Sequence, residues 1–347
     1  MDPRADDDLL TADFQFDLPE GAIAAHPPAR RDASRLMCLP RLDGAPTDHR
    51  FTDLPNLLQP GDLLVLNDTR VFPARIGAHK PRTGGRLELL LIEEREPHTW
   101  LTMVKGRIKA GEAITLDGGM DGEVTATHGD GTVTCRFPGE DVAAHLERHG
   151  EIPLPPYIHR PADAGDRERY QTVFAARTGS VAAPTSGLHF TPAVLAALDD
   201  RGVERAHVTL HVGPGTFLPV RTERIAEHRM HGERFEVSEA TAAAIERTRT
   251  RGGRVIACGT TVTRTLESAA TENGRVAPAR GSSALFIRPG YRFRVVDGLV
   301  TNFHLPGSTL LMLVSALAGR ERVLNAYREA VERGYRFFSY GDAMLIR

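Results

Sequence analysis

The sequence predicts a layered α/β domain with a small all-β module inserted into it. From about residue 71 to residue 137, short β-type runs are separated by turn residues, which is typical of a small barrel or sandwich. Beyond residue 157, helical and strand patterns alternate, as they do in layered α/β domains. Because the segment before the module is too short to fold alone, we expect a main domain of residues 1–66 and 151–347 and an inserted domain of residues 67–150.

The elements expected in the first half follow from turn residues and β-type runs. A turn at Pro60-Gly61 precedes a strand at 62–66. Glycine-rich turns such as 117–119 and 129–131 then separate the strands of the module. We expect these strands at 86–92, 99–104, 113–116, 123–127 and 132–137, followed by a helix at 140–149. The stiff, proline-rich segment 153–156 fits a domain boundary.

The second half alternates between helices and strands. Thr191 is a helix N-cap, Pro192 occupies the first turn, and Gly202 follows the last turn, which predicts a helix at 193–201. The remaining elements are a strand at 205–212, a helix at 238–251, a strand at 255–258, a helix at 261–270, strands at 284–287 and 293–296, and helices at 308–318 and 321–333.

The composition excludes several classes of protein. The 347 residues are 41% hydrophobic and 25% charged, which is enough apolar surface for a packed core and excludes a disordered or collagen-like chain. The longest apolar run, 310–318, is about half of a bilayer span, so we expect no transmembrane helix. The acidic N-terminus does not resemble a secretory signal. Three distant cysteines without a CxxC pair argue against a disulfide scaffold or a thiolate zinc site and favour a reducing cytoplasm.

Glycine-containing polar segments follow expected strands, where α/β sheets place their ligands. Residues 259–268 open a helix whose free amides can hold a carboxylate or phosphate, and an ordinary threonine-capped helix start is the alternative. Residues 211–217 end a strand in a glycine turn, where the backbone either approaches a ligand or simply reverses direction.

Three histidine-containing segments are further candidates. Small residues at 179–188 precede His189. His228, His231 and Glu233 suggest a metal site, but the HExxH order is missing, so a structural or substrate-binding role is favoured. His304 stands before a capped helix, where it is either a structural hydrogen-bonding group or a catalyst.

Taken together, these segments resemble the S-adenosylmethionine:tRNA ribosyltransferase-isomerase family of queuosine biosynthesis in order and nearly end to end. The most distinctive motifs are RDASRL at 31–36, GDLLVLNDTRV at 61–71, TSGLHF at 185–190 and FFSYGDAM at 337–344. Further matching segments are 18–20, 73–75, 83–85, 153–158, 169–173, 211–217, 259–268, 291–293, 301–306 and 308–316.

The resemblance implies a three-layer α/β/α main domain with an inserted β-barrel. It also implies an enzyme that transfers the ribosyl moiety of S-adenosylmethionine to 7-aminomethyl-7-deazaguanine at the tRNA wobble position and isomerises it, releasing adenine and methionine. S-adenosylmethionine is then a substrate, and no metal or other cofactor is implied. We expect a cytoplasmic monomer without membrane contact.

This chemistry needs a base for the proton on the carbon beside the sulfonium, a proton donor for departing adenine, and groups that hold hydroxyls and a carboxylate. The matched segments supply His189, His211, His231, Glu233 and Asp342 as catalytic candidates, with base and acid unassigned. The substrate-binding candidates are Asp68, Arg70, Thr185, Gly213, Gly215, Thr216, Thr260, Thr261, Arg264, Glu267, Asn302 and His304. We expect Arg264 to hold an anion, either the methionine carboxylate or a tRNA phosphate.

The chain departs from the family pattern at Leu218, Ala284 and Gly307, where two cations and one carboxylate are replaced. Two acceptors therefore stay open: tRNA, and a free deazaguanine base or nucleoside. A metal hydrolase using His228, His231 and Glu233 is a third hypothesis. Because the net charge is −2, binding to tRNA requires a local basic face, for which the candidates are Arg70, Arg75, Arg107, Lys109, Arg288 and Arg292.

Overall fold

A nine-stranded mixed sheet forms the centre of the main domain in this computed structural model, which describes residues 8–139, 141–217 and 220–347. The strand order is β15-β13-β12-β3-β14-β16-β17-β1-β2. In chain order these strands are β1 Arg35–Leu39, β2 Thr47–Arg50, β3 Leu63–Asn67, β12 Glu204–Leu210, β13 Glu233–Val237, β14 Val255–Cys258, β15 Ala279–Ser283, β16 Gly298–Asn302 and β17 Ala343–Ile346.

The four central strands, β12, β3, β14 and β16, run parallel. Their carboxyl ends therefore meet at one edge of the sheet, which is where open α/β sheets bind ligands. Asn67 fixes the relative position of two of these ends, because its side-chain amide donates to the carbonyl of Leu210 and accepts from the amide of the same residue.

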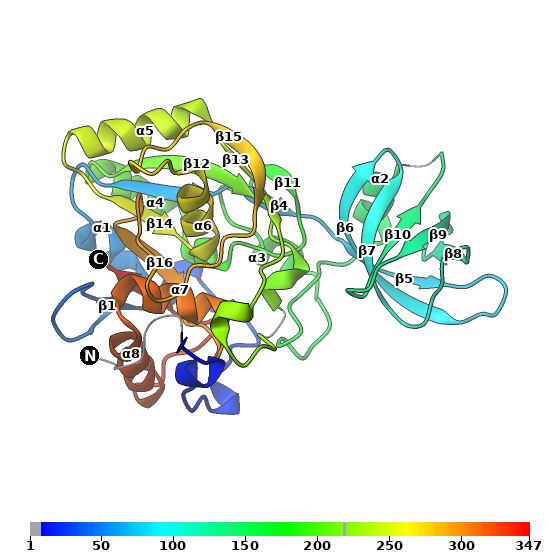
Figure 1. Ribbon diagram of the computed structural model, residues 1–347, viewed down its shortest axis with the longest axis horizontal. Coiled ribbons are helices and arrows are strands. Elements are labelled where there is room, and N and C mark those ends of the chain that lie inside the picture. The colour runs from blue at the N-terminus through cyan, green and yellow to red at the C-terminus, as the bar shows by residue number, and fades with distance from the viewer. Residues whose placement is uncertain (1–7, 140, 218–219) are drawn as a thin grey trace.

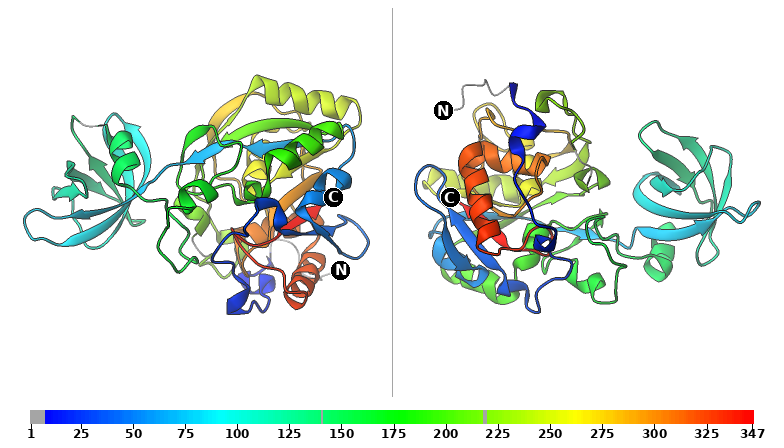
Figure 2. Two further views of the ribbon diagram at one scale, coloured as in Figure 1. Left: turned by 180° about the vertical axis from the view of Figure 1, so that it is seen from behind. Right: turned by 90° about the horizontal axis from the view of Figure 1, so that it is seen from below.

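Helices cover both faces of the sheet. Alternate residues of β3 belong to different cores: Leu63 and Val65 pack under α5 Glu239–Thr250, α6 Thr260–Ala269, α7 Thr309–Ala318 and α8 Arg320–Glu332, whereas Leu64 and Leu66 pack under α1 Leu54–Leu57 and α4 Pro192–Asp200. Figure 1 and Figure 2 show these layers. The three-layer α/β/α architecture is thus confirmed.

The inserted module is a closed barrel with the strand order β10-β7-β6-β5-β8-β9. Trp100 and Phe137 are buried in its interior, and Leu146 of α2 Val142–His149 packs against the same core. Figure 1 shows the barrel to one side of the main sheet. Its strands are β5 Arg75–His79, β6 Arg86–Glu96, β7 Thr99–Lys105, β8 Ala113–Leu116, β9 Asp121–Thr127 and β10 Thr132–Arg136. The sequence left a barrel and a sandwich open, and the structure has the barrel.

A short parallel pair, β4 Thr69–Val71 and β11 Arg177–Ser180, lies outside both sheets, and α3 Asp166–Arg169 follows the barrel in the chain. The exact domain limits at residues 66/67 and 150/151 stay a prediction. Within the described ranges, no helix combines the length and the apolar character needed to cross a membrane.

Two expected strands, 284–287 and 293–296, are wrong, because side chains of α6 use their backbone groups. The buried carboxylate of Glu267 accepts from the amides of Arg294, Val295 and Val296 at 2.9–3.0 Å. Arg264 donates to the carbonyl of Leu285. Groups bonded in this way are not available to a strand ladder.

Candidate active site

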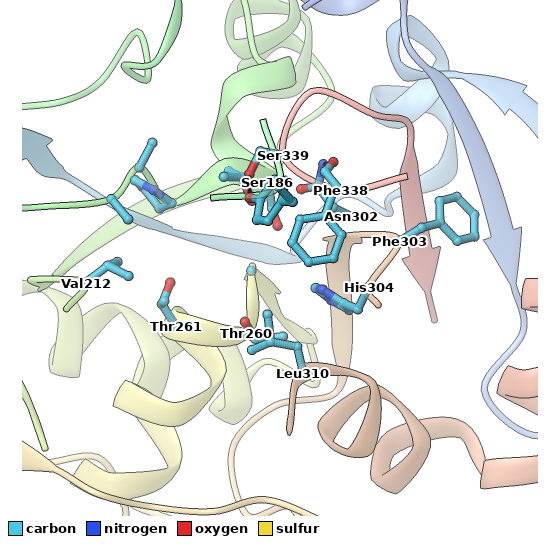
Figure 3. A pocket seen from close by; sticks show the side chains of 16 residues that line it. Ser186, Val212, Thr260, Thr261, Asn302, Phe303, His304, Leu310, Phe338 and Ser339 are labelled. Carbon is cyan, nitrogen blue, oxygen red and sulfur yellow. Dashed lines mark hydrogen bonds between the residues drawn. The ribbon is translucent and has the colours of Figure 1, made fainter. Parts of the chain in front are cut away.

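A cavity lies at the carboxyl-end edge of the central strands (Figure 3). Together with the open solvent space at its mouth it measures about 570 Å³. Five of the residues proposed from the sequence line it: Thr185, Thr260, Thr261, Asn302 and His304.

The start of α6 forms one wall of this cavity. Gly259 ends β14 with φ +94°, a conformation that favours glycine, and its amide donates to the carbonyl of Val300. Gly259, at the N-cap, has no side chain that could cap the helix, and the first amide bonded within the helix is that of Thr263. The preceding amides have no hydrogen-bond partner among the described residues, so the positive end of the helix faces the cavity at Thr260 and Thr261. The alternative of a threonine-capped start is wrong.

Asn302, at the end of β16, lines the cavity and has one side-chain oxygen without a hydrogen-bond partner among the described residues. Its Nδ2 donates to the carbonyl of Phe338 at 3.0 Å and to Nε2 of His189 at 3.1 Å. Because a carbonyl only accepts, these bonds fix the orientation of the amide. The Oδ1 atom is buried and has no partner within the part of the chain that the structure describes. A buried acceptor left unpaired is costly, so this atom is suited to a ligand that donates a hydrogen bond.

His189 lies behind Asn302 and has both ring nitrogens occupied. Since Nε2 accepts from Asn302, Nδ1 carries the proton and donates to Oγ of Ser34 at 2.9 Å. The ring also packs against Phe51, with 5.0 Å between the ring centres. Burial, and then the nearby charges of Arg336 and Arg31, lowers the pKa of His189 to about 3. This geometry makes His189 the side chain that orients Asn302.

His304 lines the cavity itself. Its Nε2 is 2.8 Å from Oγ1 of Thr301, and its backbone amide donates to the hydroxyl of Tyr327. Its Nδ1 has no hydrogen-bond partner among the described residues. Burial lowers the pKa of His304 to about 3, so the ring is neutral at physiological pH.

Sequence reasoning missed a group of aromatic and hydroxyl side chains on the opposite wall. Phe338 packs edge-to-face on Tyr157 at 3.9 Å between ring centres, and the hydroxyl of Tyr157 is hydrogen-bonded to Ser339. Phe338 has φ +71°, which is uncommon for a residue other than glycine and occurs mostly at constrained sites. The motif at 337–344 contained Phe338 and Ser339, and the matched segment 153–158 contained Tyr157, but neither charge nor spacing marked them. Ser186 also lines the cavity.

Glu233 and Arg264 form a buried ion pair, with exposed fractions of 6% and 5% for the side chains. Glu233 also accepts from the amide of Gly213, and Arg264 donates to the carbonyls of Ser283 and Leu285. The anion that Arg264 contacts in this structure is therefore the carboxylate of Glu233. This pair ties the turn after β12 to α6.

The remaining histidines lie elsewhere. His211 is hydrogen-bonded to Oγ1 of Thr69 at 2.8 Å, and burial lowers its pKa. His231 is exposed beside Gly215, and His228 packs on Phe286. Within the described ranges, no three His, Cys, Asp or Glu side chains gather as a metal site would require.

The other proposed residues are outside the cavity as well. Asp68 accepts from Thr209 in a separate hollow, and Arg70 is exposed on β4. Both oxygens of Asp342 accept backbone amides, those of Arg35 and Arg336, and Glu267 holds the 294–296 turn described above. The side chain of Thr216 lies outside the described part of the chain.

The three departures from the family pattern are placed as follows. Gly307 has φ +66°, and a Cβ there would be 2.6 Å from Nε2 of Gln15, so any side chain at this position would be strained. Ala284 is exposed directly after β15. Leu218 lies outside the described residues.

The comparisons with known proteins agree on one family. The family model described as "Queuosine biosynthesis protein" matches residues 11–346. A relative from Anaeromyxobacter dehalogenans (strain 2CP-C), named S-adenosylmethionine:tRNA ribosyltransferase-isomerase, is 57% identical over 97% of this chain and 99% of its own length. A relative of the same name from Gloeobacter violaceus is 56% identical over 99% of this chain and 97% of its own. The crystal structure of the S-adenosylmethionine tRNA ribosyltransferase from Thermotoga maritima is 38% identical, with a TM-score of 0.55, and the match covers 96% of this chain and 100% of that one.

The two buried neutral histidines predict a pH dependence of stability. An unfolded histidine titrates near pH 6.5, whereas the pKa values of His189 and His304 in the folded protein are about 3. Between these values the unfolded state binds more protons, so the free energy of unfolding falls as the pH falls below about 6.5, by up to about 1.4 kcal/mol per pH unit for each histidine. Urea unfolding between pH 5.0 and 7.5 measures this slope.

We expect His189→Gln and His304→Gln each to reduce the slope of the unfolding free energy against pH by the contribution of about one bound proton. His26→Gln, at an exposed position, is the control and should leave the slope unchanged. A slope that neither buried variant reduces would contradict the neutral state of these rings.

Proposed function

The chain belongs to the queuosine biosynthesis protein family. We propose that its cavity binds S-adenosylmethionine, whose ribosyl group is then transferred to tRNA. The reaction transfers and isomerises that group onto 7-aminomethyl-7-deazaguanine at the wobble position, giving epoxyqueuosine, adenine and methionine. The enzyme is thus an S-adenosylmethionine:tRNA ribosyltransferase-isomerase. In this proposal S-adenosylmethionine is a substrate, and no other cofactor takes part.

The observation that carries the assignment to this cavity is the pairing of an uncapped helix start with an oriented acceptor. The free amides at Thr260 and Thr261 match the carboxylate of the methionine moiety. The Oδ1 of Asn302 accepts a hydrogen bond from a ribose hydroxyl or from the adenine amino group. The rings of Phe338 and Tyr157 offer an apolar surface for adenine.

His304 is the side chain best placed to act as the base. When its Nε2–H donates to Oγ1 of Thr301, Nδ1 presents its lone pair to the cavity. The low pKa keeps the ring unprotonated, although it also reduces its strength as a base. The proton removed is the one on the 5′-carbon, which the adjacent sulfonium acidifies. His189 cannot take this part in the same geometry, because its lone pair is used by Asn302.

The acceptor requires a surface for RNA. The barrel carries a hollow lined by Lys80, Arg107 and Lys109, of which Lys80 is paired with Glu112. Arg75 is also on the barrel, and its guanidinium donates to the carbonyl of Leu154. The other candidates, Arg70, Arg288 and Arg292, lie outside the barrel, so the tRNA surface we propose spans both parts of the fold.

The test of the function is turnover with defined acceptors. Incubation with S-adenosylmethionine and tRNA carrying the aminomethyl deazaguanine should release adenine and methionine in equal amounts. The rate at limiting tRNA should fall steeply with salt, because each phosphate contact contributes about −0.7 to −0.9 to the logarithmic slope of binding. Methyl transfer, or salt-insensitive turnover of the free deazaguanine without tRNA, would overturn the proposal.

We expect His304→Asn to lower turnover at least about 100-fold while binding S-adenosylmethionine nearly as well as the parent does. Exchange of the 5′-hydrogen of bound S-adenosylmethionine with deuterated solvent, followed by mass spectrometry, should disappear in this variant. His231→Asn changes an exposed histidine outside the cavity and serves as the matched control. Retained hydrogen exchange in the His304 variant would show that another group is the base.

A further inference from the structure

Among the residues that the structure describes, two arginines behind the cavity wall make hydrogen bonds only to backbone carbonyls. Arg31 donates to the carbonyls of Glu168, Arg169 and Leu188 at 2.8–3.3 Å. Arg169, the last residue of α3, donates to the carbonyls of Pro28 and Ala29 at 2.7 and 3.0 Å. Both guanidinium groups therefore connect loops through neutral backbone carbonyls.

Neither guanidinium lies within 4.0 Å of a carboxylate in the described ranges. The nearest acidic side chains in the sequence are paired elsewhere or exposed: Asp32 contacts Arg30, Asp166 binds Arg160, and Glu168 is exposed. The Nε atom of Arg169 is buried and has no hydrogen-bond partner among the described residues. Arg169 itself is half-buried, but a buried donor atom left unpaired is costly unless an acceptor binds to it.

The charges of the two arginines also act on each other. Burial, and then the positive charge of Arg169, lowers the pKa of Arg31, and the charge of the exposed Glu168 opposes this only in part. An anion between them would remove this repulsion and accept from the free Nε, and arginine's planar fork suits the oxygens of a phosphate.

A small surface hollow is lined by these side chains. Pro27, Pro28 and Tyr340 line it together with the two arginines. Ser339 lines both this hollow and the cavity proposed for S-adenosylmethionine. The two spaces therefore share a wall residue.

We propose that this hollow binds one phosphodiester of the RNA strand, next to the nucleotide that is modified. The inference rests on the proposed function, because a base that reaches the cavity carries its own phosphates to the neighbouring surface. Contacts to phosphates fix the position of a nucleic acid without reading its sequence. Arg31 and Arg169 would thus position the wobble nucleotide, and the start of α6 would hold the methionine carboxylate.

The test uses the full-length protein and an anticodon stem-loop RNA that carries the aminomethyl deazaguanine. One RNA has a normal backbone, and two others have a single neutral methylphosphonate immediately 5′ or 3′ of that nucleotide. The wild-type protein should bind one of the neutral RNAs about tenfold more weakly, as expected for a lost charged hydrogen bond. Arg169→Gln should bind the normal RNA about tenfold more weakly and should lose less than about twofold further with the same neutral RNA.

Because each variant is compared with itself on two RNAs, a change in its folded fraction cancels. Arg328→Gln alters an exposed arginine on α8 that donates to Asn325, and it should keep the wild-type tenfold difference. Arg31→Lys keeps the charge but loses the planar guanidinium. The difference between its affinities for the normal and the neutral RNA should therefore lie between the wild-type difference and that of Arg169→Gln.

Three results would overturn the proposal. The first is an equal affinity of the wild type for all three RNAs. The second is a loss of affinity from Arg169→Gln and a loss from the neutral phosphate that are additive. The third is weakened binding of S-adenosylmethionine by Arg169→Gln with unchanged RNA binding, which would assign the hollow to the methionine carboxylate. Each of these leaves the proposed function intact if adenine and methionine are released with tRNA, and a failure of that release is seen separately in the turnover assay.

Discussion

The shared direction of four strands governs how the cavity is built. Because β12, β3, β14 and β16 run parallel, the chain leaves each of them at the same edge of the sheet. Three features of the site follow directly: the turn after β12, the start of α6 after β14, and Asn302 with His304 at the end of β16. Reversal of any one of these strands would remove its contribution. The topology of the sheet therefore determines which side chains line the cavity.

Within that frame, burial decides which groups are available for chemistry. His189 and His304 are both buried and neutral, yet they differ in what remains free. The ring of His189 is fully used between Ser34 and Asn302, whereas the ring of His304 has one nitrogen left towards the cavity. Glu233 and Arg264 are likewise buried, and in this structure each is the other's partner.

The fold class and most helices could be predicted from the sequence because capping residues and hydrophobic patterns are local signals. The strand at 255–258 and the helix that follows are examples. The strands expected at 284–287 and 293–296 failed, because distant side chains, Arg264 and Glu267, use their backbone groups and no local signal reports this. In the site, the candidates at strand ends were found by their position. Phe338 and Tyr157 were missed, because a positive φ and a ring contact across 181 residues of chain leave no mark in the sequence. The candidate histidines could not be ranked as catalytic bases until their hydrogen bonds were known.

The central claim is that the start of α6 holds the carboxylate of S-adenosylmethionine. Its most direct test is calorimetric comparison of S-adenosylmethionine with its decarboxylated analogue, which keeps the sulfonium, ribose and adenine. We expect the analogue to bind at least about tenfold more weakly, since the charged hydrogen bonds to the free amides at Thr260 and Thr261 are lost. Equal affinities for the two compounds would contradict the account.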